Sequence, residues 1–138
     1  MKHISRLLFV MFILTGVLLS ACGPKTSTAE FVPPSKLEKI EGSDLSKVIL
    51  TEKAAERIGV ETVLASGNEV PYAAVIYDIE GNTWVYTQPE PLTFVRVPIV
   101  IENIEGDTAI LAESLSSELN VVTVGVAEIY GAETGVSK

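Results

Sequence analysis

Residues 70–101 have the sequence VPYAAVIYDIEGNTWVYTQPEPLTFVRVPIVI, in which runs of β-branched and aromatic residues alternate with turn-forming residues. The first two runs, 70–78 and 83–87, are joined by the sequence DIEGN, which predicts a β-hairpin. The third run, 93–101, predicts a long strand in which Pro98 indicates an edge or a bulge. Shorter runs of the same kind lie on both sides. The sequence therefore predicts an all-β fold, a small antiparallel β-barrel or β-roll.

One short helix is expected beside these strands, at 51–59. Thr51 suits its N-cap position, and Gly59 suits the position that follows the last turn. This is the one convincing helix after the first 21 residues. The remaining runs, including 121–124 and the residues around 127–129, are expected to be strands.

The start of the chain predicts a lipoprotein signal. The sequence LSAC at 19–22 ends an apolar run that follows basic residues, as in a secretory signal peptide. The cysteine predicts that 1–21 is removed and that Cys22 carries a diacylglyceryl group. The protein is then held by Cys22 to a bilayer, on the extracytoplasmic side of the cell envelope. The alternatives are an uncleaved anchor or an ordinary signal peptide with a chance cysteine. The apolar run of about 13 residues is shorter than the roughly 20 that a membrane-spanning helix needs.

The composition of the mature chain excludes several functional classes. Removing 1–21 removes His3, Met1 and Met11, the only histidine and methionines, and lipid occupies the only cysteine. Histidine-dependent nucleophilic catalysis and His/Cys zinc sites are therefore excluded. Lys plus Arg falls from 10 to 8 against 18 Asp plus Glu, so the net charge changes from −8 to −10. Such an acidic chain is a poor candidate for binding nucleic acid. We expect neither an enzyme, a bound cofactor nor a metal site.

Composition also divides the chain. Residues 22–47 are polar and rich in proline, without a sustained period, and are expected to be a lipidated flexible tether. The β domain is expected at 48–133, and 134–138 is expected to be a C-terminal tail.

Three stretches resemble one known family. They are VPYAAVIYD at 70–78, GNTWVY at 81–86 and FVRVPIV at 94–100. In this order they resemble the membrane-proximal domain of periplasmic adaptor subunits, the membrane fusion proteins (HlyD-like family) of efflux pumps of the resistance-nodulation-division class. VILT at 48–51 and IGVET at 58–62 are similar to the segment through which such adaptors enter their barrel. The resemblance covers about 48–133.

The resemblance implies docking on a transporter in transmembrane transport, together with self-association. Full adaptors carry a biotinyl/lipoyl-like domain and a helical hairpin between the parts similar to 48–64 and 70–133, whereas here only 65–69 joins them. One copy of this chain therefore lacks the parts that reach an outer-membrane channel. The alternative function is an envelope lipoprotein that binds a small ligand or a peptide.

Two groups of side chains are candidate binding sites. Glu102, Glu105 and Asp107 surround Gly106 and could offer oxygen ligands to Ca²⁺, but a solvated hairpin tip explains them better. Trp84 and Tyr86 alternate with a valine and share one face of a strand, which favours core packing over a ligand platform.

The expected partner-docking residues are Gln88, Pro89, Glu90, Pro91 and Arg96. The first four belong to a loop that its prolines stiffen, so little entropy is lost when it binds. Arg96 either forms an ion pair with Glu102 or Asp78, which is slightly favoured, or contacts a partner.

Overall fold

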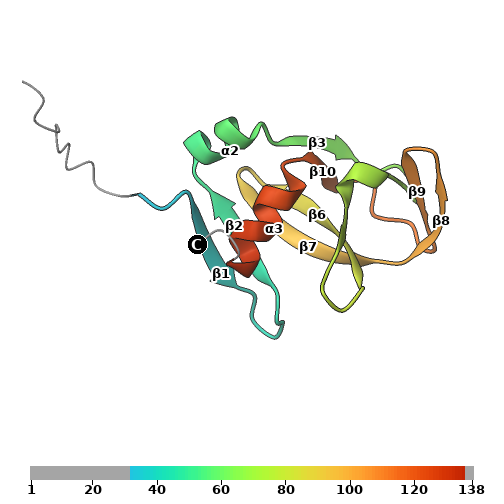
Figure 1. Ribbon diagram of the computed structural model, residues 1–138, viewed down its shortest axis with the longest axis horizontal. Helices are drawn as coiled ribbons and strands as arrows, with labels where there is room; N and C mark the ends of the chain where they lie inside the picture. Colours follow the sequence, from blue (N-terminus) through green and yellow to red (C-terminus); the bar gives the residue numbers. More distant parts are fainter. Residues whose placement is uncertain (1–31, 136–138) are drawn as a thin grey trace, which may run out of the picture. The chain divides into compact units, whose positions relative to one another are not determined.

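The computed structural model describes residues 32–135, and from Pro33 on these form one compact unit. The signal peptide and Cys22 lie outside the described residues. Figure 1 shows antiparallel strands with two short α-helices. The elements are β1 (Ser35–Lys39), β2 (Ser46–Leu50), α2 (Glu52–Ile58), β3 (Glu61–Leu64), β4 (Glu69–Pro71), the 3₁₀ turn η2 (Tyr72–Ala74), β5 (Val75–Tyr77), β6 (Thr83–Glu90), β7 (Thr93–Ile99), β8 (Ile101–Glu105), β9 (Thr108–Leu111), β10 (Asn120–Val124) and α3 (Val126–Thr134).

The strands form two antiparallel sheets. The larger has the order β1-β2-β7-β6-β10-β3, with β5 also paired to β6, and the smaller has the order β4-β9-β8. The all-β prediction is confirmed, and so is the hairpin between β5 and β6, which pairs Val75 with Val85. The described part of the larger sheet ends at β1 and β3 and is open rather than closed into a barrel. No helix in the described part of the chain is both long enough and apolar enough to span a bilayer.

Strand β6 separates two hydrophobic clusters. Tyr86 is fully buried on one face with Val48, Phe94 and Ile129, and Trp84 packs against the same cluster. Val85 is fully buried in the second cluster, on the opposite face. The prediction that the two aromatic residues share a core face is confirmed, because side chains alternate between the faces of a strand.

Helix α2 begins and ends where the sequence predicts. The Thr51 hydroxyl accepts a hydrogen bond of 3.2 Å from the backbone N–H of Ala54. Gly59 has a left-handed backbone with φ 69°, and its N–H donates to the carbonyls of Ala55 and Glu56. A residue with a Cβ is strained in that conformation, which explains the glycine.

The expected tether at 22–47 is wrong for its second half. Residues 35–39 form β1, an edge strand that pairs with β2 from Ser35 opposite Leu50 to Lys39 opposite Ser46. Backbone pairing holds an edge strand whose side chains are mostly polar, so β1 has no apolar period to detect. The folded domain therefore begins before residue 48.

The C-terminal expectation is also wrong. The residues expected to form a strand around 127–129 belong to a helix, α3, so residues 32–135 contain two α-helices. Gly125 precedes α3 with φ 86°, and a Cβ there would lie 2.5 Å from Cγ2 of Ile58. Val126 and Ile129, three positions apart, are buried against the sheet. This packing extends the domain to Thr134, one residue into the expected tail.

The long strand expected at 93–101 is two strands. Strand β7 ends at Ile99 in the larger sheet, and β8 begins at Ile101 in the smaller one. Val100 lies between them and is 68% exposed. The break brings the start of β8 beside the end of β7, where one wall of the candidate site forms.

Candidate docking site at the β5–β6 turn

The turn between β5 and β6 is organised by one carboxylate, that of Asp78. Its Oδ1 accepts hydrogen bonds of 2.9 Å from the backbone N–H groups of Glu80 and Asn82. Its Oδ2 accepts 2.9 Å bonds from the Asn82 side-chain amide and from Nε1 of Trp84. These donors, the Asn82 side chain foremost, lower the pKa of Asp78 to about 2. The carboxylate is ionised at neutral pH and fixes the turn to β6.

Ile79 lies at the tip of this fixed turn and is 100% exposed. Its neighbours in sequence are both acidic, Asp78 and Glu80. Burying an isoleucine side chain typically stabilises a protein by about 1.5–3 kcal/mol, and Ile79 contributes none of this to its own fold. The turn therefore holds a large apolar side chain in solvent at a fixed position.

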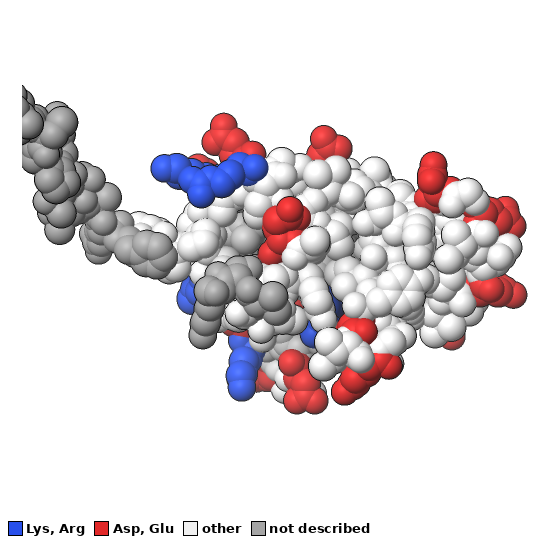
Figure 2. All heavy atoms as spheres, in the orientation of Figure 1, with Lys and Arg blue, Asp and Glu red and all other residues white. Residues whose placement is uncertain are grey.

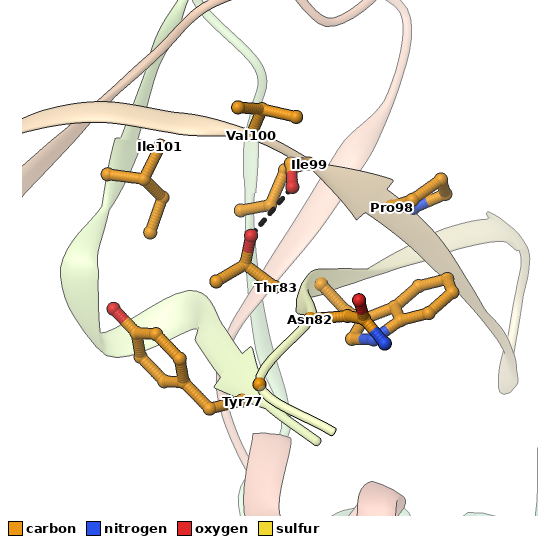
Figure 3. Close-up of a pocket in the computed structure, with 9 residues that line it drawn as sticks. Tyr77, Asn82, Thr83, Pro98, Ile99, Val100 and Ile101 are labelled. Carbon is orange, nitrogen blue, oxygen red and sulfur yellow. Dashed lines mark hydrogen bonds between the residues drawn. The ribbon is translucent and has the colours of Figure 1, made fainter. Parts of the chain in front are cut away.

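A first hollow of about 770 Å³ opens on one side of the turn. Figure 3 shows its walls: Tyr77 from β5 faces Ile101 from β8, with Thr83 between them. The Thr83 hydroxyl donates to the Ile99 carbonyl at 2.6 Å, so it is occupied within the fold. Tyr77 is half exposed, and with Val100 it makes the rim apolar.

A second hollow, of about 680 Å³, opens on the other side of the turn. It lies between the β1–β2 turn, the β5–β6 turn and α3. Its residues are Asp44, Leu45, Asp78, Ile79, Glu80, Asn82, Trp84, Arg96, Tyr130 and Thr134. Asn82 and Trp84 also line the first hollow, so the turn and the indole form the wall between the two.

Arg96 forms the structural ion pair that the sequence favoured, but with a different partner. Its Nε lies 2.9 Å from Oε2 of Glu133 in α3, rather than beside Glu102 or Asp78. The hydroxyl of Tyr86 donates to the same carboxylate oxygen. The Nε atom is buried, and its N–H does not point at the Glu133 oxygen well enough to form a hydrogen bond. The contact with Glu133 is therefore mainly electrostatic.

Aromatic rings cover the Arg96 guanidinium. Its Cζ lies 4.8 Å from the centre of the Trp84 ring and 5.7 Å from that of Tyr130, both within cation–π distance. The side chain is 14% exposed. Arg96 therefore supports the wall of the second hollow, and little of it is presented to a partner.

The expected docking loop, 88–92, is partly strand. Gln88, Pro89 and Glu90 belong to the end of β6, and only the next two residues turn the chain. Leu92 has a positive φ of 61°, and its carbonyl accepts a 2.9 Å bond from the N–H of Leu50. Pro89, Glu90 and Pro91 are exposed. The proline segment closes the β6–β7 hairpin and leaves these three side chains accessible.

The acidic residues considered for Ca²⁺ lie on the β8–β9 hairpin. Glu105 and Asp107 flank the turn at Gly106, and the side-chain amide of Asn103 donates to Glu105. All of these residues are exposed, as expected for a solvated hairpin tip.

The sequence reasoning did not single out Ile79. Asp78 and Glu80 belong to the DIEGN sequence that predicts the hairpin turn, and the hydrogen bonds of Asp78 agree with this. The available signal was an isoleucine inside a predicted turn, where polar residues or glycine are usual. Its exposure follows from the fixed backbone on either side.

The structure also brings together the segments that carry the adaptor resemblance. Val48 of the segment at 48–51 pairs with Phe94 of the segment at 94–100, because β2 is antiparallel to β7. Similarly, β3 pairs with β10. Between β3 and β4 the chain makes a tight turn, in which Ser66 bridges to Glu69. Comparison with known proteins found no matching family model, no matching curated protein and no matching solved structure.

Proposed function

We propose that this protein is a non-enzymatic lipoprotein of the cell envelope whose β domain docks on another protein of a transmembrane transport assembly. The observation that carries the proposal is Ile79, fully exposed on a turn that Asp78 fixes through four hydrogen bonds. The role resembles that of the membrane-proximal domain of an efflux-pump adaptor, which suggests a transporter of the resistance-nodulation-division class as the partner.

The energetics of protein association favour this kind of element. Binding energy in interfaces is concentrated in a few side chains that enter pockets on the partner. A fixed turn loses little conformational entropy when it binds, so most of the burial energy of Ile79 is available for affinity. The two hollows on either side of the turn can receive side chains of the partner in return.

The arrangement of the resemblance segments supports the same role. Strands from the two parts that full adaptors carry on either side of their projecting domains pair in the larger sheet here. A tight turn at 65–69 joins them, so the domain needs no insertion to fold. We infer that it acts as a docking module without the bridging parts of an adaptor.

Lipidation of Cys22 would keep the domain close to its partner. Cys22 precedes the first residue of β1 by 13 positions, which limits the distance between them to about 45 Å. Confinement near a membrane raises the effective concentration of the domain for a membrane-embedded partner. A modest affinity is then sufficient for docking.

A second candidate function is the binding of a small ligand in the first hollow. Its volume of about 770 Å³ lies within the range of ligand pockets, roughly 300–1,000 Å³. The half-exposed Tyr77 supplies a polar group, its hydroxyl, in the wall. A ligand that binds only the folded chain must raise its Tm. A thermal-shift screen therefore separates this function from protein docking.

In-cell photo-crosslinking tests the docking function. A photoreactive amino acid is placed at position 79, at 90 in the proline segment, at 105 on the β8–β9 hairpin, and at 64 as a matched control. Leu64 is an exposed apolar residue of β3 that lies outside both hollows. We expect position 79 to give an adduct with a large polytopic membrane protein, and position 64 to give none.

Other crosslinking results would change or contradict the proposed docking function. An adduct with a membrane protein from position 90 alone would move docking to the proline segment. Adducts only between copies of this chain, or only with unrelated envelope proteins, would contradict docking on a transporter.

A further inference from the structure

We propose, building on the docking function above, that the partner inserts a polypeptide segment carrying both basic and apolar side chains into the second hollow. The apolar part of this segment would contact Leu45, Ile79 and the rings of Trp84 and Tyr130, and the basic part would face the carboxylates on the rim. The proposal rests on the charges of the described residues that line the hollow.

The walls of the hollow are apolar and come from three separate elements. Leu45 comes from the β1–β2 turn, Ile79 from the β5–β6 turn and Tyr130 from α3. Trp84 lies between them, and the Asp78 carboxylate holds its indole Nε1. Tyr130 packs against the hydrophobic core, so an aliphatic side chain of the segment can contact these rings where they already lie.

The rim of the hollow is acidic. Asp44, Asp78 and Glu80 are its carboxylates. Among the described residues that line it, Arg96 is the one cation, and Glu133 neutralises it beneath the aromatic rings. An incoming Lys or Arg therefore meets three carboxylates and, among the described residues, no free positive charge at the rim.

The surface around the β5–β6 turn has the same sign, whereas the β1–β2 hairpin, which forms another wall, carries Lys36, Lys39 and Lys47. Among the residues described after Gly59, Arg96 is the one Lys or Arg. Figure 2 shows the blue side chains gathered mainly at the end formed by α2 and the β1–β2 hairpin, and red ones around the edge where the β5–β6 turn lies. This potential attracts a basic segment and repels anionic lipid and nucleic acid.

Trp84 gives a direct test, because it is the only tryptophan in the chain and it lines the hollow. The full-length lipoprotein in neutral detergent is titrated with the acetylated peptide KLKGLK and, separately, with ELEGLE. We expect a saturable change in Trp84 fluorescence with KLKGLK at up to about 1 mM, and none with ELEGLE. Added salt should weaken the response.

Two matched double variants locate the site. Asp44→Asn with Glu80→Gln removes two rim charges and should weaken KLKGLK binding about two- to tenfold. Glu102→Gln with Glu105→Gln removes two exposed charges from β8, outside both hollows, and should leave binding unchanged. Circular dichroism of both variants checks that they fold.

Several results would overturn the proposal: no response to KLKGLK, an equal response to ELEGLE, or equal weakening by the two double variants. A Trp84 signal that depends on protein concentration without peptide would assign the hollow to a second copy of this chain. A position-79 adduct with a transporter, combined with no peptide response, would leave the docking function standing and remove only the basic segment.

Discussion

Trp84 and Tyr86 lie on the same face of β6, and each donates a hydrogen bond to a carboxylate, yet the two carboxylates differ in every other respect. Asp78 lies six residues from its indole partner, in a turn open to solvent. Glu133 belongs to α3 and lies 47 residues from its phenol partner, Tyr86. Its side chain is only 5% exposed. Arg96 lies against both pairs, over the Trp84 ring and beside Glu133.

The difference separates two uses of the same interaction. The buried carboxylate contacts a cation and a phenol, and so fixes α3 to the sheet. The exposed carboxylate fixes only a local turn and leaves Ile79 in solvent. The Tyr86–Glu133 pair therefore stabilises the fold, whereas the Trp84–Asp78 pair fixes the turn that exposes Ile79. Four variants, one of them with two substitutions, test this division in order of their expected effect on the free energy of unfolding.

Glu133→Ala should have the largest effect. It leaves the Arg96 guanidinium without its counter-charge and the Tyr86 hydroxyl without its acceptor, both at buried positions. Breaking one partner of a buried ion pair typically lowers the free energy of unfolding by about 3–5 kcal/mol. Chemical denaturation measures the change, with Glu128→Ala, an exposed position on the same helix, as the control. Equal effects of the two variants would contradict the role assigned to Glu133.

Asp78→Ala should have a smaller effect that depends on pH. Hydrogen bonds lower the pKa of Asp78 from 3.8 to about 2, so its ionised form stabilises the fold fully above pH 3.8. That stabilisation is lost as the pH falls through about 2. The difference in unfolding free energy between wild type and variant should therefore be constant near neutral pH and shrink in acid.

Denaturation curves between pH 7 and pH 2 measure this dependence, and Trp84 fluorescence reports the loss of its hydrogen bond. Glu102→Gln, an exposed acidic position on β8 away from this turn, is the control. A difference that stays the same down to pH 2 would show that the Asp78 carboxylate does not stabilise the turn.

Much of the fold could be predicted from the sequence because local signals determine it. DIEGN specifies the β5–β6 hairpin, and Thr51 with Gly59 delimits α2. Two elements could not be predicted in this way. Strand β1 depends on backbone pairing with β2, and α3 depends on burying Val126 and Ile129 against strands distant in sequence. Tertiary contacts of this kind override local propensity.

The candidate site was less predictable than the fold. The sequence indicated that Arg96 forms an ion pair, but Glu133 became its partner only because α3 folds back over β6 and β7 (Figure 1). The sequence also predicts that Pro89 and Pro91 stiffen the expected docking loop. The turn that presents an apolar side chain is instead stiffened by the Asp78 carboxylate.

Replacing Pro89 and Pro91 with alanine tests that contrast. Each proline restricts the unfolded chain, so each replacement should lower the free energy of unfolding by about 0.4–1 kcal/mol where the native backbone suits proline. The crosslinked adduct from position 79 should be unchanged in yield. Loss of that adduct in a variant that still folds would give the docking role to the proline segment.

Ile79→Ser should have the smallest effect on stability and the clearest effect on docking. The side chain is fully exposed, so the unfolding free energy should stay within about 0.5 kcal/mol of wild type. Recovery of the partner identified from position 79 should nevertheless fall, since the partner loses the side chain that the turn presents. Leu64→Ser is the control, because Leu64 is exposed and lies outside both hollows. If both variants recover the partner equally, Ile79 is an exposed apolar residue without a docking role, and the comparison between the two carboxylates reduces to a difference in burial.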